Sequence, residues 1–357
     1  MSKTPVELLH ELLDAESISG AIIHKPENIR YLSGFTGEGV IALIKGARAI
    51  VTDFRYVEQA ARQAPGWAVY SIQPKQSYDA LACGLFESTE TSVAFEDDAA
   101  TVSQMRNMER ARPDILFVPI NQKPEKLREI KTDAEISAIE RACSIACEAF
   151  ESILPEIKPG RTEREIAWTL ESAMIRLGAD KPAFDTIAAS GPNGSLPHAV
   201  PGARKLQTGE FLTLDFGAMV DGYCSDITRT VALGEVGLDK RRVYETTLAA
   251  QLLALDALRP GAACKEVDAI ARDYINANGF EGRFGHGLGH SLGLMIHENP
   301  RFSPAADEQT LSPGHVMTVE PGIYRPGQDG VRIEDTVLIT EDGYKRLTPI
   351  SKELIIL

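Results

Sequence analysis

The sequence has no long uninterrupted run of apolar residues, so no segment is expected to span a membrane. Leucines 8, 9, 12 and 13 recur at helical spacing without a cleavage site, which predicts an amphipathic helix instead of a signal peptide. Cysteines are also few: five scattered residues with no Cys-x-x-Cys pair. An odd, scattered set excludes a disulfide framework and favours reduced thiols, so we expect a cytoplasmic protein.

Basic residues are in deficit, with 37 Lys and Arg against 51 Asp and Glu and a formal net charge of −14. This balance argues against nucleic acid or an anionic membrane as the partner. Recognisable serine or cysteine nucleophile motifs are lacking too. The glycines at 191 and 194 signal a loop that is too short and wrongly placed to bind phosphate.

A chain of 357 residues is longer than one typical core, and two domains are expected. Residues 1–125 alternate strand-like and helical stretches, which predicts a small α/β domain. The expected strands are residues 21–24, 40–45, 49–52, 68–71, 92–95 and 115–118. Residues 121–131 are polar and contain Pro124, so we place the junction there, with a second domain over 126–357.

The second domain repeats its own pattern. Helices are expected after Thr132, with Glu135 as its capping-box partner, and after Thr162, with Glu165. At an offset of 101 residues, Pro159, Gly160, Glu165 and Gly178 recur as Pro260, Gly261, Glu266 and Gly279. At an offset of 105, Leu206, Gly209, Asp215 and Gly217 recur as Leu311, Gly314, Glu320 and Gly322. Each half is therefore predicted to fold as two helices and an antiparallel strand pair; chance repetition of turn residues is the alternative.

Acidic residues occupy matching places in the two strand pairs. Residues 211–217 and 223–231 flank the hairpin signal Asp221-Gly222, which predicts that Asp215 faces Thr228 and that Asp226 is a diagonal neighbour, roughly 7–8 Å away at Cα. In the second half, residues 315–321 and 330–339 carry Glu320 and Glu334.

A single acid on a strand usually faces solvent. Four acids that converge between apolar neighbours cannot all be ionised without cations. Oxygen ligands with one or two imidazoles suit Mn²⁺, Fe²⁺, Co²⁺ or Zn²⁺, and two ions are expected instead of one.

Histidines cluster between positions 198 and 315. Residues 285–290 are predicted to form a glycine-rich loop that contains His286 and His290 and lets backbone approach a metal closely, and His290 is the predicted fifth ligand. His198 and His297 lie in Pro-flanked turns that can present an imidazole to a cavity. Each of these histidines, taken alone, is also compatible with an ordinary turn or core residue.

On these residues the chain resembles the pita-bread metallopeptidases, and within them the Xaa-Pro dipeptidase (prolidase) and aminopeptidase P branch. The segments that carry the resemblance are LPHAV, LDFGAMVDGYCSDITRT, GHGLGH, IHENP, TVEPGIY and VRIEDT, with weaker support from NIRYLSGFTGEG and VTDFRY. The resemblance implies an α+β protein: a C-terminal pita-bread domain preceded by a smaller creatinase/prolidase-like N-terminal domain.

The resemblance also implies a function and roles for individual residues. The expected reaction is hydrolysis of the bond before proline in peptides or dipeptides by a homodimer that binds two divalent ions, with manganese expected. Asp226 and Glu334 would bridge both ions, Asp215 would complete one shell, and His290 and Glu320 the other. His198 and His297 would contact the scissile peptide, and Glu320 would transfer a proton. The residues that match substrate-positioning and supporting roles are His286, Arg301, Tyr324 and Arg332.

Met295 departs from the family pattern, in which an acid is expected before Ile-His-Glu. This bears on fine specificity and leaves ligation intact. A metal-free relative, either a creatinase-like hydrolase or a peptide-binding module, is the alternative function, and the complete ligand set argues against it. The sequence leaves the choice between dipeptidase and aminopeptidase open.

Overall fold

The computed structural model describes residues 3–87 and 91–357. The chain divides into two compact units, residues 1–128 and 129–357, and each is described by itself. The predicted division after residue 125 falls inside helix α6 (Lys123–Glu129). Pro124 does not break this helix because it lies in the first turn, where a missing N–H is tolerated.

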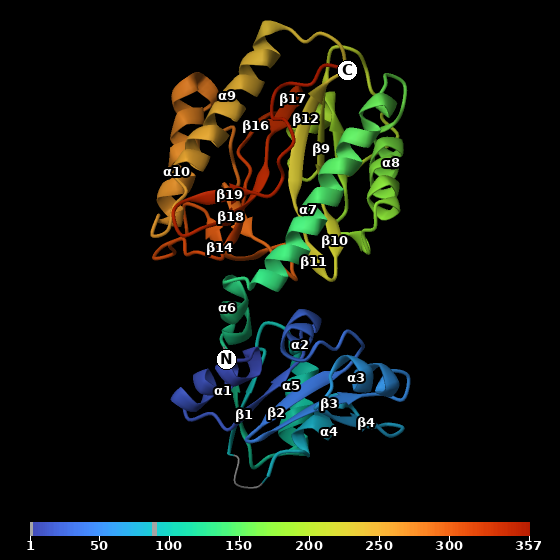
Figure 1. Ribbon diagram of the computed structural model, residues 1–357, viewed down its shortest axis with the longest axis vertical. Coiled ribbons are helices and arrows are strands. Elements are labelled where there is room, and N and C mark those ends of the chain that lie inside the picture. The colour runs from blue at the N-terminus through green and yellow to red at the C-terminus, as the bar shows by residue number, and fades with distance from the viewer. Residues whose placement is uncertain (1–2, 88–90) are drawn as a thin grey trace. The chain divides into compact units, whose positions relative to one another are not determined.

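The N-terminal unit is a mixed sheet with helices, and all six predicted strands are present (Figure 1). Its strands are β1 (Gly20–Ile23), β2 (Val40–Ile44), β3 (Ala47–Thr52), β4 (Ala68–Ser71), β5 (Ser92–Phe95) and β6 (Leu116–Pro119). Its other helices are α1 (Pro5–Ala15), α2 (Pro26–Ser33), α3 (Val57–Gln63), α4 (Tyr78–Cys83) and α5 (Val102–Ala111).

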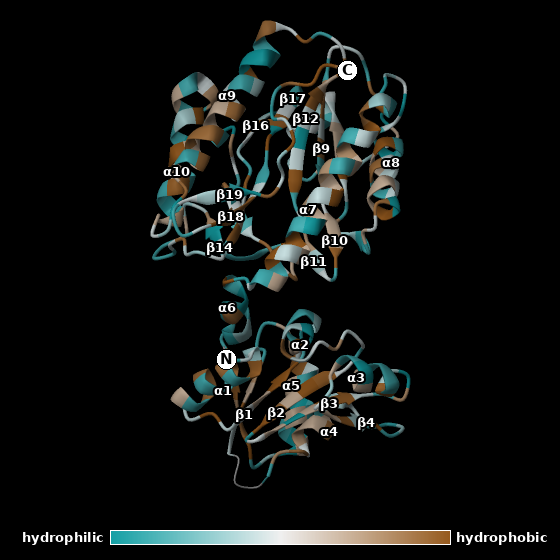
Figure 2. Cartoon of the chain, in the orientation of Figure 1, coloured by the Kyte–Doolittle hydropathy of each residue, from teal (hydrophilic) through white to brown (hydrophobic). Residues whose placement is uncertain are grey.

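The strand order in this sheet is β4-β3-β2-β1-β5-β6. Strand β2 runs antiparallel to both of its neighbours, and the outer pairs are parallel. The central strands are almost fully buried, as expected for apolar runs covered on both faces, and they are brown in Figure 2.

The first half of the C-terminal unit contains two helices followed by a β-ribbon. Its elements are α7 (Asp133–Ile153), η1 (Leu154–Glu156), α8 (Glu163–Arg176), β7 (Lys181–Pro182), β8 (Ile187–Ser190), η2 (Gly191–Ser195), β9 (Phe211–Phe216), β10 (Ala218–Val220), β11 (Tyr223–Cys224) and β12 (Ile227–Ala232). Both predicted capping boxes are formed, at Thr132 with Glu135 and at Thr162 with Glu165. The helices pack on the ribbon through apolar side chains, with the rings of Phe150 and Phe216 stacked at 5.8 Å.

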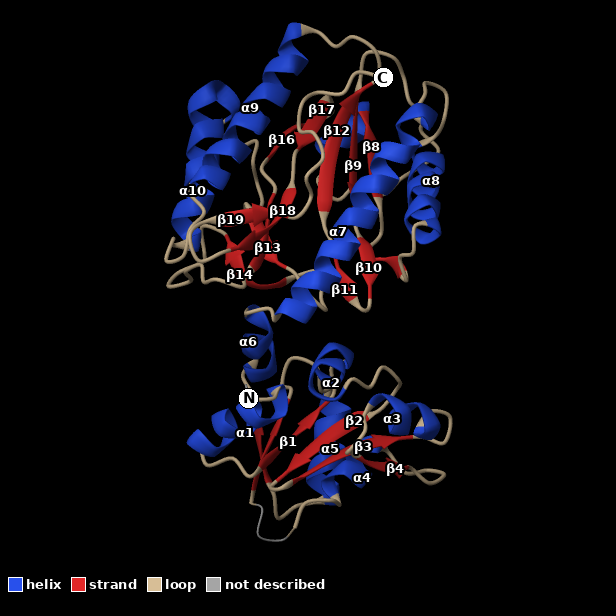
Figure 3. Cartoon of the chain, viewed as in Figure 1, coloured by secondary structure: helices blue, strands red, loops and turns tan. Residues whose placement is uncertain are grey.

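The second half repeats this order. Its elements are α9 (Leu238–Asp256), α10 (Cys264–Ile275), η3 (Asn276–Phe280), β13 (Gly289–Ser291), β14 (Glu298–Phe302), β15 (Val316–Val319), β16 (Gly322–Arg325), β17 (Asp329–Arg332), β18 (Asp335–Ile339) and β19 (Tyr344–Arg346). In Figures 1 and 3, α7 and α8 flank the strands on one side and α9 and α10 on the other. A separate apolar cluster packs under each helix pair.

Hydrogen bonds confirm the predicted repeat at the predicted offsets. Gly160 N–H donates to Leu206 O at 2.9 Å, and Gly261 N–H donates to Leu311 O at 2.8 Å. An isolated bridge joins Thr162 to Lys205 in the first half, and another joins Ala263 to Thr310 in the second. Ala263 follows Thr162 by 101 residues, and Thr310 follows Lys205 by 105. Because both halves close the same loop with the same hydrogen bonds, the repeat reflects a duplicated fold and not a chance repetition of turn residues.

The ribbon register is confirmed, but the strands are not continuous. Val220 pairs with Tyr223 and Asp215 with Thr228, as predicted. The turn residues Asp221 and Gly222 both have positive φ, the geometry that this hairpin signal requires. Each long strand is nevertheless interrupted, the first ribbon between β9 and β10 and between β11 and β12, and the second between β15 and β16 and between β17 and β18.

The first interruption has a local cause at Gly217. A Cβ at this residue would lie 2.0 Å from Ser225 O and 2.9 Å from the Phe184 ring, so only glycine permits the close approach of the two chains. One backbone bond remains here, from Ser225 N–H to Ala218 O at 2.9 Å, while Ala218 N–H donates to the Ser225 hydroxyl at 2.9 Å instead of to a carbonyl.

The variant Gly217→Ala is expected to lower the free energy of unfolding by about 1–3 kcal/mol, because the added methyl group overlaps the opposite backbone. Urea unfolding of the metal-free protein measures it. Gly343→Ala is the matched control, since its added Cβ would meet no described atom within 4 Å, and it should stay within about 0.5 kcal/mol of wild type. Equal stability of the two variants would contradict this account of the interruption.

Candidate metal centre

Three of the four predicted acids lie where the ribbons are interrupted. Asp226 lies between β11 and β12, Glu320 between β15 and β16, and Glu334 between β17 and β18. Asp215 lies within β9, opposite Thr228. In these gaps the main chain is released from the ladder, so the carboxylates turn inward without disturbing the pairing on either side.

Hydrogen bonds hold the two ribbons side by side. Glu334 N–H donates to Thr228 O at 3.1 Å, and the Thr228 hydroxyl donates to Glu334 Oε2 at 2.7 Å. On the other side of the junction, the Thr336 hydroxyl donates to Asp226 O at 2.6 Å. The acids of both halves therefore meet at one centre, as the duplication predicts.

Asp215, Asp226 and Glu334 each place one carboxylate oxygen within 4.8 Å of the others. His290 Nε2 lies 3.6 Å from Asp226 Oδ2 and 3.4 Å from Glu320 Oε1. These separations are long for hydrogen bonds. They match two ligands of one ion, which lie about 3–3.5 Å apart when each is 2.0–2.2 Å from the metal.

The cluster is buried, and its charges repel one another. Burial, then the neighbouring Glu334, Asp215 and Glu320, hold the pKa of Asp226 well above its usual value. Burial, followed by Glu320 and Asp215, does the same to the pKa of Glu334. Burial also raises the pKa of Glu320 to about 8, although Arg332 opposes it. Cations between these groups would remove the repulsion and keep all of them ionised.

His290 directs a lone pair at these carboxylates. Its Nδ1 lies 3.1 Å from Ser291 O, and a carbonyl only accepts, so Nδ1 carries the proton. Burial, then His297, lower the pKa of His290 to about 3, so Nε2 is unprotonated at neutral pH. A lone pair facing anionic oxygens is repulsive unless a cation lies between them, and a backbone carbonyl on the other nitrogen is usual for a metal-bound histidine.

Two buried oxygen atoms provide a further test of fit. Within residues 3–87 and 91–357, neither Asp215 Oδ1 nor Glu334 Oε1 has a hydrogen-bond partner. An unpaired buried carboxylate oxygen is costly, and a metal ion is the partner that the surrounding oxygen and nitrogen donors fit.

Arg332 supports the acids from the neighbouring strand β17. Its Nη2 donates to Asp215 Oδ2 at 2.7 Å, and its Nη1 donates to the Tyr324 hydroxyl at 2.9 Å. That hydroxyl lies 2.7 Å from His286 Nε2, so His286, Tyr324 and Arg332 form one chain that ends on Asp215. Burial, although it is opposed by Arg332, raises the pKa of Tyr324 to about 12, and it lowers that of His286 to about 4.

A cavity of about 620 Å³ opens over the acids. Its wall includes the predicted His198, His297 and Arg301 together with apolar side chains. The His297 ring lies edge-on to His290 with centroids 4.4 Å apart. The Arg301 side chain makes no hydrogen bond or ion pair with another described residue, and this residue of the cavity wall is exposed. Every predicted site residue thus lies at the acid cluster, in the cavity wall or in the Arg332 chain.

His290 differs from expectation in one respect. The segment 285–290 was predicted to be a loop, but His290 lies on strand β13. Gly289 makes this strand fit, because a Cβ there would lie 2.1 Å from Thr318 O on the neighbouring β15. The glycines serve close strand packing here, and the imidazole is held by a rigid element.

Two threonines at the centre were not predicted. Thr228 binds Glu334, as described above, and the Thr318 hydroxyl donates to Glu320 Oε1 at 3.2 Å while accepting from His290 N–H at 3.0 Å. Each lies two residues from an acid, Thr228 from Asp226 and Thr318 from Glu320. The alternation of side chains along a strand was therefore the signal that could have identified both.

Buried oxygen and nitrogen donors at the floor of a cavity, on a duplicated helix and ribbon framework, define the class: a metallohydrolase of the pita-bread fold. Comparison with known proteins gives the family. The model of metallopeptidase family M24 matches residues 137–341, and that of the Creatinase/Prolidase N-terminal domain matches residues 5–130. The chain belongs to metallopeptidase family M24.

Individual relatives cover the whole chain. It is 41% identical over 357 residues to the Xaa-Pro dipeptidase of Pyrococcus furiosus, covering 99% of this chain and 100% of the relative. It is similar to the solved structure of an Xaa-Pro dipeptidase from Bacillus anthracis, with a TM-score of 0.94, 41% identity and 99% of both chains covered. It is also similar to an X-Pro aminopeptidase from Thermotoga maritima, with a TM-score of 0.90, 34% identity and 99% of both chains covered.

Among the helices of the described residues, none is both long and apolar enough to cross a membrane.

The variant Asp226→Asn is expected to weaken Mn²⁺ binding by more than about 100-fold, because an amide cannot replace a shared anionic ligand. Loss of a residue that only hydrogen-bonds a ligand costs about 10–100-fold. Isothermal titration of the metal-stripped protein measures the dissociation constant. Asp221→Asn, in the exposed hairpin turn, is the control and should bind like wild type. Unchanged binding in Asp226→Asn would remove Asp226 from the centre.

In the metal-free protein, the free energy of unfolding is expected to fall as the pH rises from 7 to 8. The pKa of Glu320 is raised from 4.5 to about 8, so between these values the folded chain still holds a proton that the unfolded chain has already lost, and stability falls until the folded chain releases it near pH 8. Each such proton lowers stability by up to about 1.4 kcal/mol per pH unit.

Urea unfolding in the presence of a chelator at several pH values measures this slope. Glu320→Gln should flatten it, and saturating Mn²⁺ should stabilise the wild type more at pH 8 than at pH 7. The account would be wrong if wild type and Glu320→Gln showed the same pH dependence.

Proposed function

We propose that this protein hydrolyses the peptide bond between an N-terminal residue and a following proline. The observation that carries the proposal is the buried cluster of four carboxylates and one imidazole at the floor of a cavity. Membership of family M24 supports peptide hydrolysis. Relatives named Xaa-Pro dipeptidase at about two-fifths identity over the whole chain support the substrate.

The proposed centre holds two divalent ions. Asp226 and Glu334 would be shared by both, Asp215 would complete the shell of one ion, and His290 and Glu320 that of the other. When bound, the ions would polarise the scissile carbonyl and lower the pKa of water. Manganese is the proposed metal, since oxygen-rich sets with one imidazole accept it, and Co²⁺, Fe²⁺ and Zn²⁺ fit the same donors.

The chain's own residues would orient the substrate and move the proton. Glu320 would take a proton from the attacking water and deliver it to the proline nitrogen as the bond breaks. His198 and His297 lie in the cavity wall, where an imidazole N–H can donate to the carbonyl oxygen as negative charge develops on it. Arg332 holds Asp215 in place with a charged hydrogen bond.

Arg301 is the proposed substrate-binding cation. Its guanidinium is exposed at the cavity and pairs with none of the described residues, so it is free to meet a substrate carboxylate. A dipeptide presents such a carboxylate directly after its proline. We therefore propose the dipeptidase activity over the aminopeptidase activity, and the relatives named Xaa-Pro dipeptidase favour the same choice. The homodimer and the cytoplasmic location stay predictions of the resemblance.

The substrate test compares Xaa-Pro dipeptides with Xaa-Pro-Yaa-Zaa tetrapeptides of the same first residue, in the presence of Mn²⁺. We expect kcat/KM to be at least about tenfold higher for the dipeptide, because only there does the carboxylate follow proline directly, a difference of about 1.4 kcal/mol in transition-state binding. Liquid chromatography of the released first residue measures both rates.

Arg301→Gln should raise KM for the dipeptide more than for the tetrapeptide. Faster cleavage of the tetrapeptide would indicate an aminopeptidase. Failure to cleave either peptide, while Xaa-Ala is cleaved, would disprove the preference for proline.

A further inference from the structure

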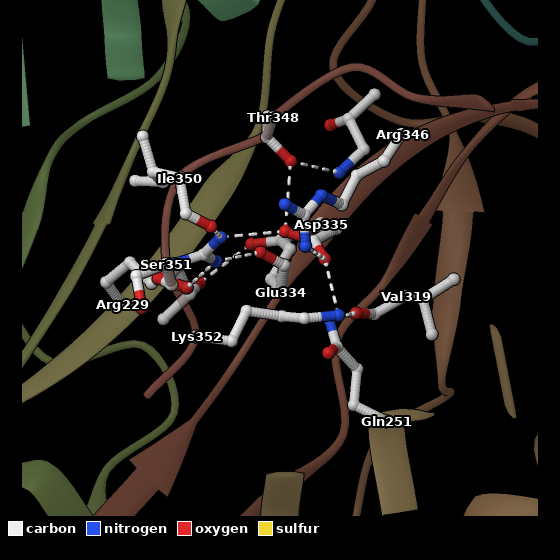
Figure 4. A network of polar contacts seen from close by, with 12 residues as sticks. Arg229, Gln251, Val319, Glu334, Asp335, Arg346, Thr348, Ile350, Ser351 and Lys352 are labelled. Carbon is white, nitrogen blue, oxygen red and sulfur yellow. Dashed lines mark hydrogen bonds and ion pairs between the residues drawn. The ribbon is translucent and has the colours of Figure 1, made fainter. Parts of the chain in front are cut away.

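A buried ionic network surrounds Arg229 and Asp335, next to Glu334 (Figure 4). Neighbouring residues on a strand point to opposite faces. Thr228 and Glu334 face the cluster, whereas the residues that follow them, Arg229 and Asp335, face away from it. Arg229 is 1% exposed and Asp335 is fully buried, and neither residue has a role in the proposed reaction.

Arg229 uses all three of its guanidinium nitrogens to join three segments of the chain. Its Nη1 donates to Thr228 O at 2.9 Å and to Glu334 O, and its Nη2 donates to Asp335 Oδ1 at 2.8 Å. Two further bonds reach the C-terminal segment, from Nε to Ser351 O at 2.9 Å and from Nη2 to Ile350 O at 3.3 Å. A planar group with several donors suits such a junction, whereas an ammonium does not.

The bond to Glu334 matters because this residue lies outside any strand, between β17 and β18. Its main-chain position is therefore not fixed by pairing within a β-strand. Its N–H donates to Thr228 O and its carbonyl accepts from Arg229, so both ends of the residue are held by β12. Glu334 is one of the three acids that could hold a metal ion, and its Oε1 has no hydrogen-bond partner among residues 3–87 and 91–357.

Asp335 keeps the guanidinium in place from the other side. Besides Arg229, its Oδ1 accepts from the Thr348 hydroxyl at 3.1 Å, and its Oδ2 lies 3.0 Å from Lys352 Nζ and 3.8 Å from Arg346 Nη1. Buried ion pairs contribute little net stability, because desolvation offsets most of their attraction. Fixing the geometry of neighbouring groups is the role that such a pair can serve better than apolar packing.

We propose that Arg229 is a positioning residue for the metal centre. It holds the main chain of Glu334 against β12, and so sets the distance from the Glu334 carboxylate to Asp226 and Asp215. Asp335 and the carbonyls of residues 350 and 351 orient Arg229. The C-terminal segment therefore contributes to metal affinity through Arg229. This inference rests on the proposed role of Glu334 as a ligand.

The test is Mn²⁺ binding to metal-stripped protein, by isothermal titration, in Arg229→Lys. Lysine keeps the charge but cannot bind Glu334 O, Asp335 and Ser351 O together. We expect the dissociation constant to rise about 10–100-fold, the usual cost of losing an outer partner of a ligand. The matched control is Arg325→Lys, which alters another arginine–aspartate pair, with Asp329, at the far end of the second ribbon, and its dissociation constant should be that of wild type.

A second variant keeps the test decisive if Arg229→Lys does not fold. Asp335→Asn keeps the shape and the Oδ1 acceptor but removes the charge that orients Arg229, and it should also weaken Mn²⁺ binding. Thermal unfolding and circular dichroism show which variants are folded. The proposal is overturned if folded Arg229→Lys has the wild-type dissociation constant. If Arg229→Lys does not fold, the same result in folded Asp335→Asn overturns it. An equal loss of Mn²⁺ affinity in Arg325→Lys also overturns it.

The titration does not depend on the substrate. If wild-type protein binds Mn²⁺ and leaves Xaa-Pro peptides uncleaved, the proposed substrate is wrong, while the ratio of dissociation constants still decides the role of Arg229.

Discussion

The repulsion among four converging carboxylates is the constraint on which the rest of this structure depends. Asp215, Asp226, Glu320 and Glu334 meet at one centre, where burial and mutual charge raise the pKa of the last three. Without a cation, such a cluster is stable only when protons are held among its members. His290 is neutral at neutral pH, and the lone pair on its Nε2 faces the same point. This lone pair can bind a metal ion, but it does not take up a proton at that pH. Divalent metal is the partner that satisfies all five groups at once.

The duplicated fold brings these groups together because each half contributes one interrupted ribbon. An unbroken strand would align its side chains along a ladder at fixed spacing. The gaps at Gly217, at Asp226 and at Glu334 let the acids turn towards the pseudo-twofold centre while the pairing continues on both sides. Threonines on the same faces then bind the carboxylates, and Arg332 on β17 reaches across to Asp215.

Charge behind and beside the cluster complements it. Arg332 binds the Asp215 carboxylate directly, whereas Arg229 binds the main chain of Glu334. The two arginines lie on opposite faces of adjoining strands, so Asp215 is held at a carboxylate oxygen and Glu334 at its backbone carbonyl. This double support is what a centre needs if its ligands are to keep metal spacing while they repel one another.

The local features of this protein were readable in its sequence. Capping boxes at Thr132 and Thr162, the Asp221-Gly222 turn, the register that pairs Asp215 with Thr228 and the two offsets of the repeat depend on contacts between near neighbours, which sequence spacing specifies. What only the tertiary structure decided were the breaks in the ribbons, the strand that carries His290, the helix around Pro124 and the bonds of Arg229 to residues 350 and 351. These depend on which distant segments approach to within a few ångströms, and a pattern of residue types along one chain does not encode that distance.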